Sequence, residues 1–185
     1  RCEVAHEMRS CRGSLQATRE KNCTLATLLA DDCAMPVHQS VLELIGETPI
    51  VQVQRLDTGC CELFLKLESQ NPGGSIKDRI GLSMIESAEK AGRIKPGDTL
   101  VEGTAGNTGI GLALVAQQKG YKLILVVPDK MSREKIFNLK AMGAEVVLTR
   151  SDVAKGHPQY YQDMAERIGR ETPGAYLINQ FGNPD

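Results

Sequence analysis

An α/β fold, in which helices flank a twisted parallel sheet, is the fold class that the sequence predicts. In the second half of the chain, short apolar runs rich in β-branched residues alternate with longer runs of helical character. Glycines and prolines separate these runs, as is typical of the turns between strands and helices. Four apolar strands joined by helices require right-handed crossovers, which place helices on both faces of a parallel sheet.

The first half of the chain predicts two strands and one helix. The strands are expected at residues 49–53 and 62–67. A helix is expected from the SIKDRI run to about residue 92, because apolar residues recur there at fourfold spacing: Ile76, Ile80, Met84 and Ala88.

The second half supplies the remaining elements. We expect strands at 99–102, 122–127, 145–149 and 175–179, and helices at 107–119, 132–142 and 158–170. Ser132 has the identity of a helix N-cap, and Pro158 suits the first turn of a helix. Gly120 and Gly143 follow the ends of two helices, where a left-handed residue is common.

The charges of the chain nearly cancel. There are 22 Lys and Arg residues against 23 Asp and Glu, a net charge of −1. No overall field would therefore attract nucleic acid or an anionic membrane surface. No apolar run approaches the ~20 residues of a membrane-spanning helix. We expect no nucleic-acid partner, no membrane partner and a cytoplasmic location.

The cysteines are concentrated at the start of the chain. Cys2, Cys11, Cys23 and Cys33 lack the paired CxxC spacing of zinc sites, so we predict no metal site. Cys60 and Cys61 are expected to be free buried thiols. Residues 1–38 lack a strong apolar period and are predicted to be a poorly ordered N-terminal extension, with the folded part at 39–185.

Lys77 is the first candidate catalytic residue. It follows the turn NPGGS and lies in the first turn of the predicted helix, so its amine faces the positive end of the helix dipole. That position favours the neutral amine, which attacks carbonyl groups and forms an imine with an aldehyde. The competing interpretation is a solvated lysine paired with Asp78 or with a neighbouring helix.

A second glycine-rich turn, EGTAGNTG at residues 102–109, lies between a predicted strand and a predicted helix. Consecutive backbone N–H groups at such a helix start can bind a carboxylate or a phosphate. The spacing is GxxGxG, which differs from the dinucleotide fingerprint, and no P-loop lysine follows. An amine at one helix start and an anion site at another match the needs of an enzyme that holds an amino acid on pyridoxal phosphate.

Five motifs in order resemble the cysteine synthase and cystathionine β-synthase family, the fold-type II pyridoxal phosphate enzymes with a tryptophan synthase β-like fold. They are LIGETPI at 44–50, LKLESQNPGGSIKDRI at 65–80, KPGDTLVEGTAGNTGIGLA at 95–113, PDKMSREK at 128–135 and NQFGNPD at 179–185. The resemblance implies that residues 39–185 are the N-terminal portion of the catalytic domain. We expect the chain to stop before the loop that holds the cofactor phosphate.

The resemblance also implies roles for individual residues. Lys77 corresponds to the lysine that binds pyridoxal 5'-phosphate, and Asn107 to the asparagine that contacts the phenolic oxygen of the cofactor. The substrate carboxylate is assigned to the loop from residue 104 to 108 and to Gln180; the loop members are Thr104, Ala105, Gly106, Asn107 and Thr108. The family usually has Ser where this chain has Ala105, which removes one hydroxyl donor.

The activity implied is a β-replacement on serine or an O-activated serine. We favour cystathionine β-synthase, which joins L-serine and homocysteine, because PDKMSREK is more similar to that branch. Cysteine synthase, which uses O-acetylserine and sulfide, is the alternative. The substrates are then a small amino acid and a thiol or sulfide, and a homodimer is expected for the full-length protein. Two further hypotheses are an inactive truncated homologue and a non-catalytic anion-binding α/β module.

Overall fold

A parallel sheet lies at the centre of the part of the chain that the structure, a computed structural model, describes: residues 36–104 and 106–183. Its four strands are ordered β5–β4–β3–β6. The strands are β3 (Thr99–Gly103), β4 (Lys122–Pro128), β5 (Glu145–Thr149) and β6 (Ala175–Leu177). Thr99 is paired with Lys122 on one side and with Ala175 on the other, so the carboxyl ends of three strands meet at one edge. The predicted parallel sheet is confirmed.

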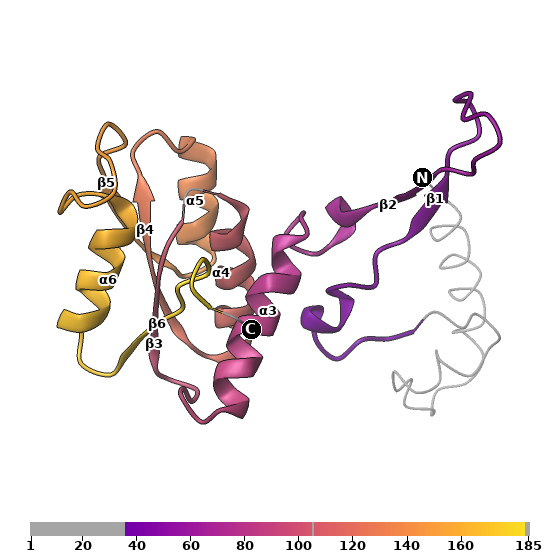
Figure 1. Cartoon of the computed structure of the whole chain (residues 1–185). Coiled ribbons are helices and arrows are strands. Elements are labelled where there is room, and N and C mark those ends of the chain that lie inside the picture. Colours follow the sequence, from indigo (N-terminus) through magenta and orange to yellow (C-terminus); the bar gives the residue numbers. More distant parts are fainter. Residues whose placement is uncertain (1–35, 105, 184–185) are drawn as a thin grey trace, which may run out of the picture. The chain divides into compact units, whose positions relative to one another are not determined.

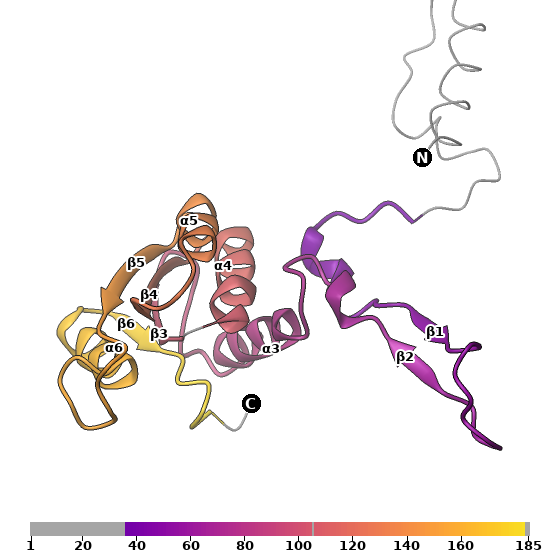
Figure 2. The same ribbon diagram turned by 90° about the horizontal axis from the view of Figure 1, so that it is seen from above.

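Helices cover both faces of this sheet, as predicted (Figure 1). They are α3 (Lys77–Lys90), α4 (Asn107–Lys119), α5 (Arg133–Ala141) and α6 (Tyr161–Glu171). Two views show α3, α4 and α5 on one face and α6 on the other (Figure 2). The alternation of strand residues explains this arrangement. Leu100 and Leu125 pack in the cluster with α3, α4 and α5, whereas their neighbours Val101 and Val126 pack against α6.

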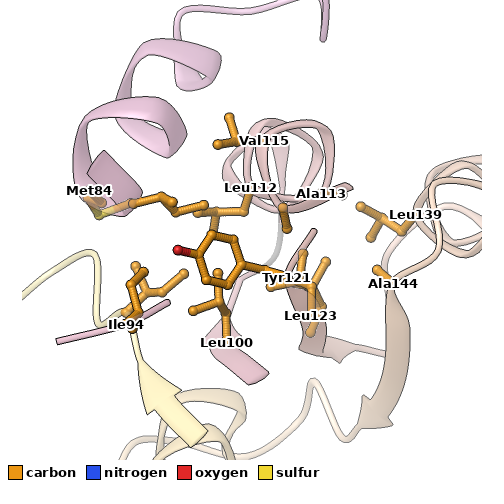
Figure 3. Packing of buried hydrophobic residues seen from close by; sticks show 14 of the residues in the cluster. Met84, Ile94, Leu100, Leu112, Ala113, Val115, Tyr121, Leu123, Leu139 and Ala144 are labelled. Atoms are coloured by element: carbon orange, nitrogen blue, oxygen red, sulfur yellow. The ribbon is translucent and has the colours of Figure 1, made fainter. Parts of the chain in front are cut away.

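The larger apolar cluster includes one buried tyrosine, Tyr121. The ring of Tyr121 lies among aliphatic side chains that include Leu100 and Leu112 (Figure 3). Its hydroxyl donates a hydrogen bond of 2.8 Å to Glu89, which also accepts one of 2.8 Å from Lys119. The polar end of a buried tyrosine usually needs such a partner, and this one ties α3 to the end of α4.

Two glycines allow α3 and α4 to approach closely. A Cβ atom at Gly81 would lie 2.9 Å from the carbonyl carbon of Gly111. A Cβ atom at Gly111 would lie 2.7 Å from the carbonyl oxygen of Lys77. Backbone therefore touches backbone at this crossing, which fixes the first turn of α3 against the first half of α4.

Most predicted element boundaries lie within two residues of the observed ones. Ser132 caps α5 as predicted, and its hydroxyl accepts from the N–H of Lys135. The helix predicted from residue 158 begins only at Tyr161, because the preceding residues form a turn in which the Gln159 carbonyl accepts from the Thr149 hydroxyl. The last strand ends before Asn179, whose φ of 53° interrupts an extended chain.

The two upstream strands form a separate antiparallel pair. They are β1 (Ile50–Gln52) and β2 (Phe64–Lys66), with short 3-10 helices at Val41–Leu44 and Glu68–Gln70. The expectation of buried thiols was wrong for Cys60 and Cys61, which are exposed in the turn-rich connection between these strands. Residues 1–35 of the expected poorly ordered extension at 1–38, with its four cysteines, lie outside the described residues. Within the described ranges, no helix is both long and apolar enough to cross a bilayer.

Glu68 joins the segment before α3 to α3 itself. Arg79 donates to both carboxylate oxygens of Glu68, at 2.8 Å and 2.9 Å. The hydroxyl of Thr48 and the amide of Asn71 donate to the same group, at 2.7 Å and 3.0 Å. The hydrogen bonds from Arg79 and Thr48 lower the pKa of Glu68 from 4.5 to about 2.

We expect the stability of the fold to depend on the ionisation of Glu68. Because its folded pKa is lowered, its contribution is complete above pH 4.5 and is lost as the pH falls toward 2. Replacing Arg79 with Met should therefore reduce the loss of unfolding free energy between pH 5 and pH 2.5, measured by urea denaturation. Lys90→Met, at the other end of α3, is the control and should follow the wild type. Equal pH dependence in wild type and Arg79→Met would contradict this prediction.

Candidate active site

One cavity of about 370 Å³ collects most of the predicted site residues. It is lined by Ser75, Ile76, Lys77, Thr104, Gly106, Asn107, Thr108, Tyr161, Gln180 and Phe181. The starts of α3 and α4 and the segments after β3 and β6 contribute these residues. The carboxyl edge of a parallel sheet is where open α/β folds bind ligands, and the volume suits a small molecule.

Lys77 is the cationic residue among the described lining residues. Its backbone N–H donates to the hydroxyl of Ser75 at 3.2 Å, so Ser75 holds the first turn of α3 in place. In the described part of the chain, no carboxylate lies within ion-pair distance of its amine. The amine of Lys77 is thus available to a ligand in the cavity.

Asp78 does not pair with Lys77, contrary to the competing interpretation. Its side chain is fully buried and accepts a hydrogen bond from the N–H of Gly73. Burial raises the pKa of the Asp78 carboxyl. A Cβ atom at Gly73 would lie 2.4 Å from this carboxyl group, so the glycine is required where the turn folds over Asp78. Asp78 therefore shapes the turn that leads into Lys77.

The turn between β3 and α4 forms the opposite wall. The hydroxyl of Thr104 accepts from the N–H of Gly106 at 3.4 Å, and both Thr104 and Thr108 are buried. The Asn107 carbonyl oxygen accepts from the Lys135 amine at 3.3 Å, which leaves its Nδ2 group as the donor toward a ligand. The N–H of Gly109 donates to the Gly106 carbonyl at 3.1 Å, and the N–H groups of a helix start that lack such a partner can donate to a ligand. Ala105, the remaining predicted loop residue, lies outside the described residues.

Gln180 reaches the cavity from the segment after β6. Its side-chain Nε2 donates to the buried carboxylate of Glu102 at 3.1 Å. Six of the seven predicted site residues therefore lie around one cavity: Lys77, Thr104, Gly106, Asn107, Thr108 and Gln180.

Two aromatic lining residues were not among the predicted site residues. Tyr161 packs on the α6 face of the sheet and also lines the cavity. Burial and the neighbouring Tyr160 and Glu102 raise the pKa of Tyr161 to about 12. Phe181 follows Gln180 directly, so adjacency to a predicted site residue was the one signal that could have identified it.

Comparison with known proteins assigns the chain to a family. The model of the family described as pyridoxal-phosphate dependent enzyme matches residues 41–185, which include both glycine-rich turns and the segment after β6. The chain belongs to this family. The prediction from the sequence motifs is confirmed.

Relatives and solved structures agree with this assignment. The chain is 48% identical over 149 residues to a cystathionine beta-synthase of Dictyostelium discoideum, covering 80% of this chain and 30% of the relative. It is 51% identical over 147 residues to a cysteine synthase of a Flavobacterium species, covering 79% of this chain and 47% of the relative. A hydrogen sulfide-producing enzyme from Fusobacterium nucleatum superposes with a TM-score of 0.72 at 43% identity, over 81% of this chain and 48% of that one.

The chain therefore spans between about a third and a half of the length of these relatives. An O-ureido-L-serine synthase gives a TM-score of 0.74 at 40% identity, over 80% of this chain and 46% of that one. With neighbours at this similarity, the fold is that of the fold-type II pyridoxal phosphate enzymes, and the predicted fold class is confirmed.

The donor set of the cavity fits pyridoxal 5'-phosphate. An aldehyde cofactor needs a primary amine, which Lys77 provides without a competing carboxylate partner among the described residues. Anionic groups need N–H and hydroxyl donors, which the start of α4 with Thr104 and Thr108 provides. Among the described residues, no group of three His, Cys, Asp or Glu side chains is placed to hold a metal ion.

Proposed function

We propose that the protein catalyses a pyridoxal phosphate-dependent β-replacement on serine or an O-activated serine, and that it is a cystathionine β-synthase acting on L-serine and homocysteine. The observation that supports this proposal is one cavity lined both by Lys77, whose amine has no carboxylate partner among the described residues, and by the start of α4. An amino-acid substrate needs both: an amine-linked cofactor for its nitrogen and a separate site for its carboxylate.

Each residue of the cavity has a role in this proposal. When bound, pyridoxal phosphate supplies an electron sink for the substrate carbon atoms. Lys77 would hold the cofactor through Nζ, and the same amine would accept the α-proton of the substrate. The Nδ2 group of Asn107 would donate to the phenolic oxygen of the cofactor. The loop from Thr104 to Thr108, with Ala105 and Gly106, binds the substrate carboxylate together with Gln180.

The similarities support cystathionine β-synthase and, as the second candidate, cysteine synthase. Relatives from Dictyostelium discoideum, Rattus norvegicus and Saccharomyces cerevisiae, all named cystathionine beta-synthase, are 45–48% identical to this chain. The Flavobacterium relative, at 51% identity, is named cysteine synthase. O-acetylserine and sulfide are therefore the alternative substrates that we propose for this chain.

A side-by-side assay of the full-length protein distinguishes the two activities. We expect the holoenzyme to turn over L-serine with homocysteine at a kcat/KM at least ~10-fold above that for O-acetylserine with sulfide. Product formation is measured by mass spectrometry for both pairs at the same enzyme concentration. The reverse ratio would assign the cysteine synthase activity, and no turnover of either pair by cofactor-loaded protein would contradict the β-replacement.

The organisation of the full-length protein follows from the same proposal. Residues 39–185 would form the N-terminal portion of its catalytic domain, with a second portion completing the cofactor site. The homodimer and the cytoplasmic location stay predictions.

A further inference from the structure

A buried carboxylate lies behind the cavity wall. Glu102 is at the carboxyl end of β3 and is 2% exposed. It does not line the main cavity but a small neighbouring one, together with Asn179 and Phe181. A ligand in the main cavity would therefore not touch this carboxylate.

Within residues 36–104 and 106–183, the hydrogen bonds of Glu102 all come from the turn that carries Gln180. The Nε2 group of Gln180 donates to Oε1 at 3.1 Å, and the backbone N–H of Gln180 donates to Oε2 at 3.4 Å. The backbone N–H of Asn179 also donates to this carboxyl group. Successive N–H groups around a left-handed residue form a concave anion site. Here the φ of Asn179 is 53°, and the anion is a side chain of the same chain.

These contacts constrain both the turn and the amide of Gln180. A non-glycine residue in the left-handed region costs on the order of 1 kcal/mol, so the conformation needs neighbours that stabilise it. One hydrogen of the Gln180 amide group is directed to Glu102, which leaves the other hydrogen and Oε1 for the cavity. Without Glu102, the amide would be free to rotate.

An ionised carboxylate at Glu102 contributes little to the stability of the fold. Burial raises the pKa of Glu102 from 4.5 to about 7, although the three hydrogen bonds from residues 179 and 180 oppose the shift. Two titratable residues of α6 interact with it or share its cavity: Tyr161, whose pKa it raises, and Glu166, which lines the same small cavity. A buried acid whose described hydrogen-bond partners belong to one turn of the binding cavity has the character of a functional residue.

We propose that Glu102 is a positioning residue: it holds the turn at residues 179–181 and the side-chain amide of Gln180 in the orientation that binds the carboxylate of the amino-acid substrate. This inference rests on the proposed function for the identity of the substrate. The hydrogen bonds themselves do not depend on that function, so they are tested separately.

Kinetics of the full-length holoenzyme test whether Glu102 affects substrate binding. Glu102→Gln keeps the size of the side chain but replaces one acceptor oxygen by an NH2 group. It should raise KM for L-serine roughly tenfold to a hundredfold, the range of charged hydrogen bonds, with kcat within about threefold. Gln180→Ala should have a similar effect. The double variant should be no worse than Gln180→Ala alone, because Glu102 acts through Gln180. Glu166→Gln is the matched control and should keep the wild-type KM.

Hydrogen exchange at the backbone N–H groups of residues 179 and 180, measured without substrate, tests whether Glu102 holds the turn. Exchange should be faster in Glu102→Gln than in wild type and Glu166→Gln, while the cofactor absorbance stays unchanged. Unchanged exchange, an unchanged KM or additive effects in the double variant would each overturn the inference. If wild type turns over neither substrate pair, the proposed function fails, and the exchange result alone decides whether Glu102 holds the turn.

Discussion

Replacing Lys77 with alanine in the full-length protein is expected to abolish covalent attachment of pyridoxal phosphate and to lower kcat/KM at least ~10³-fold. Lys77 is the lysine among the described residues that line the cavity, so no other described amine is placed to bond the aldehyde. The variant also lacks the amine that accepts the α-proton in the proposed mechanism. The loss of covalent attachment is measured by the visible absorbance of the bound cofactor and by peptide mass spectrometry after borohydride reduction. The loss of activity is measured as kcat/KM.

Lys90→Ala is the matched control, because it removes the same side chain from the last turn of the same helix. It should retain the absorbance and the kinetics of the wild type. The assignment of Lys77 is wrong if borohydride attaches the cofactor to a different lysine. It is also wrong if Lys77→Ala keeps wild-type turnover.

Gly111→Ala is expected to reduce both stability and activity, although the substituted residue lies outside the cavity. The added Cβ atom would lie 2.7 Å from the carbonyl oxygen of Lys77 and 3.0 Å from the Cα atom of Asp78, and neither backbone atom can move alone. Overpacking of this kind costs about 1–3 kcal/mol of unfolding free energy. A displacement of Lys77 by about 1 Å would lower kcat by roughly 10²-fold. Urea denaturation and steady-state kinetics measure the two effects.

Gly169→Ala is the control that separates the steric effect of the α3–α4 contact from the effect of alanine on helix propensity. Gly169 also lies inside a helix, but its added Cβ atom would meet Leu177 at an ordinary 3.5 Å. Alanine is favoured over glycine in a helix by up to about 1 kcal/mol, so this variant should be as stable as wild type or more stable. Equal stabilities for the two variants would show that the α3–α4 approach is looser than the structure describes.

Several site residues were accessible to sequence analysis because their signals are local. The glycines before Lys77 and those around Asn107 mark turns, and the apolar period after each turn marks a helix. Gln180 was identified only through its motif, since nothing in its immediate surroundings distinguishes it from other glutamines. Tyr161 was not identified, because a tyrosine at a helix start has the same sequence pattern whether it faces a core or a cavity.

The order of strands and helices, the parallel sheet and the two helix starts with their glycine turns were determined by the sequence alone, since periodicity and turn chemistry act over a few residues. Only the tertiary structure decided that these helix starts face one cavity, through backbone contact at Gly81 and Gly111. It also decided that Glu102 meets Gln180, which lies 78 positions away along the chain. Contacts of this kind arise from close packing between distant segments, and close packing leaves no periodic trace in the sequence.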